Sequence, residues 1–214
     1  MGAGKHRQQV FQRPPDPDLD YRRFPYQTFK AGTRWHRQHD AALGPWWFSC
    51  SMLGRFDLAE PDGTCYLADS PESAVRERVG PDIAQSRQVA ASVLADRVVS
   101  TLALPAPVRA ANLESNRAAD RYGVTGELST MTPYDVTQAW ARALHQAGFG
   151  GVCGRLRFTV SRHRGLAIFG AAGSRPGWAA DPSPVSLADV AGRMGIAIID
   201  PPDDDQLTII TPPR

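Results

Sequence analysis

Cysteines are few in this 214-residue chain, and no hydrophobic run is long. Cys50, Cys65 and Cys153 are an odd number at wide spacings, which fits neither a disulfide framework nor a CxxC metal site. No apolar run reaches the ~18 residues needed to cross a bilayer, and the first residues lead into no hydrophobic signal core. We therefore expect reduced thiols, a cytoplasmic location and no membrane partner.

Common motifs of phosphate and metal binding are also missing. The run Gly2-Ala3-Gly4-Lys5 lacks the spacing and the Ser or Thr of a phosphate loop, and residues 148–154 do not open a helix as a dinucleotide fingerprint must. The five histidines include no i, i+4 pair, so we expect no metal site and no resident cofactor. A formal net charge of +2 is too small to predict direct nucleic acid binding.

The composition favours one folded domain. With 42% hydrophobic residues, a chain of this length can bury one well-packed core. Residues 1–25 are rich in Arg, Gln, Pro and Asp and have few apolar side chains, which predicts an extended, poorly ordered arm unless a partner holds it. We therefore predict an N-terminal arm over residues 1–25 and one domain over residues 26–214.

Start and stop signals indicate a mixture of helices and strands. Ser70, Pro71 and Glu72 mark a helix start, because a small polar cap, an early proline and an early acid all suit free helical amides. A second helix is expected from Pro81 to about Asp96. Other expected elements are strands over residues 26–35, 98–104, 166–170 and 207–210, a polar connection over 36–45, and helices over 114–121, 133–147 and 187–194. Without regular alternation, the fold class is α+β rather than doubly wound.

One stretch concentrates chemistry that suits a nucleotide. Arg55, Tyr66 and Glu77 lie on consecutive predicted elements, a loop, a short apolar strand and a helix. Glu77 falls about two turns into its helix at ~3.6 residues per turn, so it can point back toward the strand end. We therefore predict that these side chains meet over one cleft.

Each of these residues has an ordinary alternative. Arg55 can be a surface or loop-pinning arginine, and Tyr66 can be a core residue with its hydroxyl on a backbone partner. Glu77 is flanked by Arg76 and Arg78, which also suits a solvated helix face. The basic residues Arg155, Arg157, Arg162, His163 and Arg164 form either a phosphate-facing strand or an exposed hairpin.

In combination, these motifs resemble the RES-domain family. The resemblance rests on Gly54-Arg55-Phe56, the segment 63–68, Ala74 to Glu77, and the late segments 150–152 and 166–169. It implies a fold similar to ADP-ribosyltransferases, with mixed and antiparallel sheets, flanking helices and a single catalytic domain. It also implies a toxin of a toxin–antitoxin pair, with an Xre-like antitoxin as partner, through which an oligomer can form.

The resemblance further implies NAD as substrate, consumed by cleavage of the nicotinamide–ribose bond. The family's first-strand arginine matches Arg34, its loop arginine Arg55, its strand tyrosine Tyr66 and its glutamate Glu77; the implied catalytic residues are Glu77, Arg34 and Tyr66. The expected serine is missing from residues 150–157, and Ser161 can replace it in cofactor binding only if the strand shifts by about five residues. Two alternatives therefore stay open, a nucleotide-binding module with reduced or lost activity and a protein ADP-ribosyltransferase.

Overall fold

A computed structural model describes residues 11–160 and 162–200. Its elements, in chain order, are η1 (Tyr21–Arg23), β1 (Tyr26–Phe29), β2 (Arg34–Asp40), β3 (Trp47–Phe48), β4 (Asp62–Ala68), α1 (Pro71–Ser86), β5 (Gln88–Ala90), α2 (Ala91–Leu94), β6 (Arg97–Ala103), β7 (Val108–Asn112), α3 (Asn116–Tyr122), η2 (Gly126–Ser129), α4 (Asp135–Gln146), β8 (Gly151–Arg155), β9 (Arg164–Ala171), β10 (Gly173–Ser174), β11 (Val185–Ser186), α5 (Leu187–Arg193) and β12 (Ala197–Ile199).

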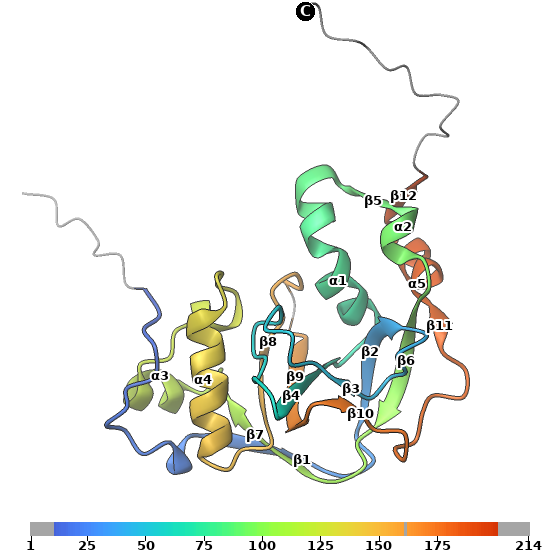
Figure 1. Cartoon of the computed structure of the whole chain (residues 1–214). Coiled ribbons are helices and arrows are strands. Elements are labelled where there is room, and N and C mark those ends of the chain that lie inside the picture. The colour runs from blue at the N-terminus through green and yellow to red at the C-terminus, as the bar shows by residue number, and fades with distance from the viewer. Residues whose placement is uncertain (1–10, 161, 201–214) are drawn as a thin grey trace, which may run out of the picture.

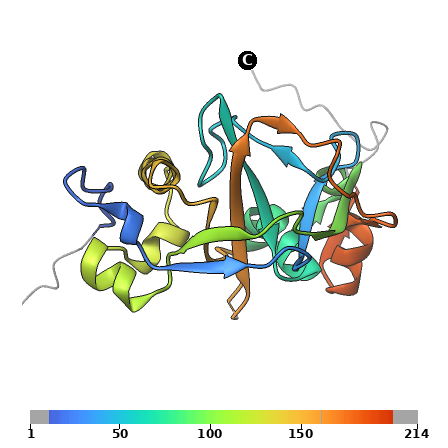
Figure 2. The same cartoon turned by 90° about the horizontal axis from the view of Figure 1, so that it is seen from below.

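An eight-stranded sheet forms the centre of the molecule. Its strand order is β1-β7-β8-β9-β4-β2-β6-β11. The pairs are antiparallel except for β7 and β8, which run parallel. Helices α3 and α4 lie on one side of the molecule and α1, α2 and α5 on the other (Figure 1), while the edge strand β1 runs beside β7 (Figure 2). The predicted α+β class with mixed and antiparallel sheets is confirmed.

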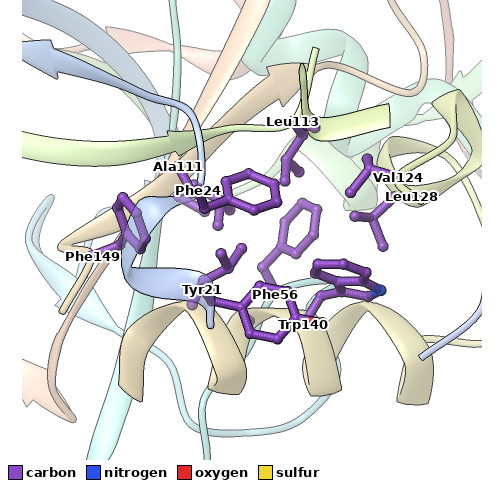
Figure 3. Packing of buried hydrophobic residues seen from close by; sticks show 14 of the residues in the cluster. Tyr21, Phe24, Phe56, Ala111, Leu113, Val124, Leu128, Trp140 and Phe149 are labelled. Carbon is purple, nitrogen blue, oxygen red and sulfur yellow. The ribbon is translucent and has the colours of Figure 1, made fainter. Parts of the chain in front are cut away.

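Aromatic side chains fill the core at the α4 end. Phe24, Phe56 and Trp140 gather over α4 (Figure 3), and the ring centroids of Phe24 and Trp140 are 6.2 Å apart. Trp140 belongs to the apolar stripe of α4, which the sequence predicted. The helix itself begins at Asp135, with Tyr134 as its cap residue, rather than at Pro133.

The region before residue 26 is where the sequence prediction needs correction. Residues 11–25 do not form an extended arm, because Phe24 is only 1% exposed and Tyr21 packs beside it in the same core cluster. Asp20 caps η1 by accepting a hydrogen bond from the Arg22 amide. Near the start of the segment, the buried Gln12 accepts a hydrogen bond of 2.7 Å from the Thr125 N–H, so residues 11–25 are attached to the domain at both ends. Residues 1–10 lie outside the described part of the chain.

Several predicted boundaries also change. The expected strand over residues 26–35 is divided into β1 and β2 by a turn in which Gly32 has a φ of 78°, and β2 continues to Asp40 through the expected polar connection. The helix α1 starts where predicted, with Ser70 accepting a hydrogen bond from the Ser73 amide. It then runs through Pro81, so no second helix begins there. The strand expected over residues 207–210 lies outside the described residues.

The helix α5 follows its prediction closely. Ser186 accepts a hydrogen bond from the Asp189 amide at 3.0 Å, and the helix ends at Arg193, just before Gly195. Its buried residues join those of α1 and β6 in a separate apolar cluster that includes Val75, Val99 and Leu187. This cluster fixes α1 against the sheet, and so determines where Glu77 lies.

Replacing Phe24 by alanine tests the corrected boundary. Because the ring is fully buried, its loss should lower the free energy of unfolding by about 3–5 kcal/mol. The exposed neighbour Arg23, changed to alanine, should alter it by less than about 0.5 kcal/mol. Denaturant unfolding of both variants measures the difference. Equal free energies of unfolding for F24A and wild type would contradict the packing of this segment on the domain.

Candidate active site

A cavity of about 350 Å³ opens between β4, α1 and the loop before β4. Its lining includes Arg55 from that loop, Tyr66 from β4 and Glu77 from α1. These three residues, separated by 22 positions of sequence, therefore converge on one hollow as predicted. Their roles in binding or catalysis are a separate question from this placement.

The carboxylate of Glu77 is held by the segment that follows β8. Its Oε1 accepts a hydrogen bond of 2.8 Å from the backbone N–H of Phe158. Burial raises the pKa of Glu77 above its ordinary value, and the Phe158 hydrogen bond and the charges of Arg55 and Arg157 oppose this rise. Glu77 is thus a half-buried acid inside the cavity, not a solvated residue of the helix face.

Phe158 belongs to a segment that packs directly on α1. A Cβ placed on Gly80 would collide with the Phe158 ring, and a Cβ on Gly165 would contact the Leu156 side chain. At Gly80, a larger residue would displace the Phe158 ring. Leu156, Arg157 and Phe158 therefore form one wall of the cavity.

Tyr66 presents its side chain to the cavity with its hydroxyl already engaged. The hydroxyl donates to Asp57 Oδ1 at 2.7 Å and accepts from the Phe56 N–H at 2.9 Å. Burial, together with the Asp57 carboxylate, raises the pKa of Tyr66 well above its ordinary value, so the phenol stays neutral at physiological pH. The ring, rather than the hydroxyl, is the part left for a ligand.

Arg55 brings a positive charge to the cavity. Its guanidinium lies 5.5 Å from the centre of the Tyr134 ring, and its buried Nε has no hydrogen-bond partner among the described residues. A buried guanidinium N–H without a partner costs free energy, which an anionic ligand would recover. Arg55 is therefore the cation best placed to bind a phosphate in this hollow.

Arg34 and Ser161 do not join this group. Arg34 starts β2, is exposed, and is absent from the cavity lining. It lies on the same strand face as His36, which does line the cavity, so Arg34 can reach only a part of a ligand that extends outside. Ser161 lies outside the described residues.

Other basic residues divide between structural and cavity positions. Arg37 lines the cavity, but its guanidinium donates to the carbonyl oxygens of Pro45 and Trp47, each at 2.8 Å. Arg155 also lines it and forms an ion pair of 2.8 Å with Glu114, while Arg157 lines it without an ion pair among the described residues. Arg155 and Arg157 therefore face the cavity, and their contact with a phosphate stays a prediction.

His163 and Arg164 do not line the cavity and instead contact acidic side chains elsewhere. His163 Nδ1 lies 2.9 Å from Asp69 Oδ1, and Arg164 Nε lies 3.4 Å from Glu114 Oε2. Arg162 is exposed. Sequence reasoning also left three features unassigned: the Phe158 amide, the His36 ring and the Asp57 carboxylate. Only Asp57, next to the Gly-Arg-Phe motif, carried a signal that pointed to the site.

No group of three or more His, Cys, Asp or Glu side chains that could hold a metal ion occurs among residues 11–160 and 162–200. In the same ranges, none of the helices combines the length and the apolarity needed to cross a membrane. The three cysteines are free thiols, and burial raises the pKa of Cys153 to about 11.

A family model described as the RES domain matches residues 11–184, most of the chain. The chain belongs to the RES-domain family. The match begins inside the segment that the sequence had suggested as an arm, in agreement with the packing of residues 11–25. No curated protein matches the chain.

Among solved structures, the chain is similar to one described as the crystal structure of the M. tuberculosis MbcT–MbcA toxin–antitoxin complex. The TM-score is 0.56 at 18% sequence identity, and the match covers 77% of this RES-domain chain and 90% of the other. At this identity the likeness concerns the fold alone.

Glutamine in place of Glu77 tests the burial of the acid. Because the folded-state pKa lies above the unfolded one, the folded protein binds more protons between them, and its free energy of unfolding falls as the pH rises through that window. Glutamine keeps an oxygen for the Phe158 amide and removes this loss. The E77Q variant should melt with wild type near about pH 3.5, below the ordinary glutamate pKa, and above it near neutrality.

The measurement is a series of thermal melts of both proteins across that pH range. Subtracting one series from the other removes the titration of all other groups. A wild type that gains stability relative to E77Q as the pH rises would show that the Glu77 pKa is lowered instead.

Proposed function

We propose that this RES-domain protein consumes NAD by cleaving the bond between nicotinamide and ribose. The observation that carries the proposal is the meeting of Glu77, Arg55 and the Tyr66 ring in one cavity. An acid, a cation and an aromatic face match three parts of the substrate: the ribose, the pyrophosphate and the nicotinamide.

The chemistry needs an anion more than it needs an acid. When the C1′–N bond breaks, its electron pair goes to the pyridinium nitrogen and nicotinamide leaves neutral, so the leaving group needs no proton. Positive charge develops on the ribose ring, as at the transition states of glycosidases. The Glu77 carboxylate stabilises that charge, and a water, a phosphate or a protein side chain then bonds to C1′.

The other two residues bind and orient. The planar guanidinium of Arg55 pairs with pyrophosphate oxygens, which recovers the hydrogen bond that its Nε lacks. Tyr66 offers a ring face to nicotinamide, worth about 0.5–1.5 kcal/mol beyond area burial for an aromatic pair. Arg157 adds positive charge on the far wall of the cavity.

A second candidate is a module that binds NAD or a related nucleotide with little or no turnover. The observation in its favour is the segment from Gly150 to Arg157, which carries no hydroxyl where the family resemblance expects a serine. In its place the apolar Leu156 lines the cavity and packs on Gly165. Transfer of ADP-ribose to a protein side chain is the third possibility, and it differs only in the acceptor.

The biological setting follows the structural neighbour. That structure is of a toxin–antitoxin complex, and we propose the same kind of role here, a cytoplasmic toxin with an Xre-like antitoxin as partner. A gene for a small DNA-binding regulator beside this one would support it.

The decisive experiment follows free nicotinamide from NAD, with and without phosphate or a protein acceptor. Wild type should release it, and E77Q should lower kcat roughly 100- to 1,000-fold, as other losses of transition-state charge stabilisation do. The exposed Arg76 on the same helix, changed to alanine, serves as the matched control and should stay within about twofold. No release by wild type under any condition, with saturable NAD binding by calorimetry, would favour the binding module.

Replacing Arg55 by lysine separates binding from chemistry. Lysine keeps the charge but loses the planar fork, so KM should rise roughly tenfold while kcat changes less. Arg34→Ala should have a smaller effect than Arg55→Ala, because Arg34 lies outside the cavity. Steady-state kinetics of the three variants measure both. An Arg34 variant that is worse than the Arg55 variant would reverse the assignment.

A further inference from the structure

Asp57 is a buried carboxylate that the proposed chemistry does not use. Its residue is 1% exposed, and within the described ranges no Lys, Arg or His forms an ion pair with it. A carboxylate removed from water is costly unless it is paired or fully hydrogen-bonded. Its presence therefore requires a structural reason.

The hydrogen bonds of Asp57 supply that reason. Its Oδ1 accepts from the Tyr66 hydroxyl at 2.7 Å, and its Oδ2 accepts from the Gly54 N–H at 3.0 Å and from the Ser51 hydroxyl at 3.2 Å. A longer contact of 3.5 Å joins Oδ2 to the Ser49 hydroxyl. An ionised carboxylate only accepts, so it suits a place surrounded by donors better than an amide does.

These partners lie on both sides of Arg55 and on the Tyr66 ring. Gly54, whose N–H binds Asp57, is the residue before Arg55. Phe56, the residue after Arg55, donates its N–H to the Tyr66 hydroxyl that binds Asp57. A Cβ at Gly54 would collide with both the Asp57 carboxylate and the Tyr66 hydroxyl, so the turn is closed tightly around the acid. One carboxylate thus connects the loop that carries Arg55 with the strand that carries Tyr66.

The helix α4 holds the same loop from outside. The buried Gln138 donates from Nε2 to the carbonyl oxygens of Met52 and Gly54, each at 2.9 Å. The buried Thr137 hydroxyl donates to the Arg55 carbonyl oxygen. The backbone around Arg55 is therefore hydrogen-bonded on one side to Asp57 and on the other to α4.

We propose that Asp57 is a positioning residue for NAD cleavage, which fixes the Arg55 loop and the Tyr66 ring in the geometry that receives the dinucleotide. This inference rests on the proposed function for its substrate, but its structural half stands on the loop alone. Asp57 contacts neither the cavity's ligand space nor the reacting atoms, since it does not line the cavity.

The test replaces Asp57 by asparagine, which has the same shape but presents an NH₂ group to at least one donor. Trypsin cleaves after arginine, so a looser loop should be cut faster at the Arg55–Phe56 bond in the otherwise folded protein. We expect D57N to raise this cleavage rate at least about tenfold over wild type, as 1.4 kcal/mol of local opening would. Mass spectrometry of the fragments identifies the site. Ser100→Ala, which removes a buried hydrogen bond to His39 elsewhere in the sheet, is the matched control and should leave it unchanged.

Kinetics provide the readout that a merely structural role would not move. D57N should lower kcat/KM for NAD roughly 10- to 100-fold, and in an Arg55→Ala background the same change should cost clearly less, because only the Tyr66 ring is then left for Asp57 to position. An equal cost in both backgrounds would overturn the positioning role.

The two proposals fail in different ways. Wild type without nicotinamide release overturns the NAD reaction, yet the trypsin comparison still decides the structural half. Unchanged cleavage at Arg55 in a folded D57N overturns the positioning role whether or not NAD is consumed. Should D57N not fold, Gln138→Met loosens the same loop from α4 and is expected to give the same results.

Discussion

The carboxylate of Glu77 in a partly buried cavity is the constraint around which this site is built. A carboxylate in such a place resists ionisation, yet the proposed reaction needs its charged form. The surrounding structure offsets this with the Phe158 N–H and with the positive charges of Arg55 and Arg157. Arg55 lies in the loop before β4, whereas Arg157 and Phe158 are neighbours in the segment after β8, so two distant parts of the chain must pack together before Glu77 has this environment.

The sheet supplies that assembly. Pairing of β4 with β9 in register from Asp62 to Ala68 places Tyr66 opposite Ala167, and the chain then turns directly into α1. The segment that leaves β8 packs on Gly80 of this helix and delivers the Phe158 amide. In the loop before β4, the Gly54 N–H donates to the Asp57 carboxylate and the Gly54 carbonyl oxygen accepts from Gln138 of α4. These two hydrogen bonds fix the position of Arg55. The placement of the candidate site residues thus depends on packing between elements that are distant in sequence.

Local signals in the sequence predicted what local physics controls. The Ser70 cap and Pro71 identified the start of α1, and the spacing from there placed Glu77 toward the strand end. The helix does not stop at Pro81, because Ile83, beyond the proline, packs against the same apolar cluster as Val79, and this contact offsets the hydrogen bond that proline cannot make. The arm predicted for residues 1–25 rested on the average composition of that segment, in which Tyr21 and Phe24 count for little although both are buried in the core.

Long-range contacts could not be predicted in this way. Nothing near Phe158 in the sequence indicates that its amide meets a carboxylate 81 positions earlier. Arg34 and Arg55 are equivalent candidates by residue type, and only the register of β2 and the closed turn at Gly54 separate them. The family resemblance added the order of the motifs, which periodicity alone does not contain.

The most direct measurement of the central claim is a crystal structure of the E77Q protein with NAD bound, since this variant should consume the dinucleotide far more slowly than wild type. The account predicts the nicotinamide ribose beside residue 77, nicotinamide against the Tyr66 ring and a pyrophosphate oxygen within hydrogen-bond distance of Arg55. NAD seated elsewhere on the molecule, or in the cavity with Arg55 turned away from its phosphates, would contradict it.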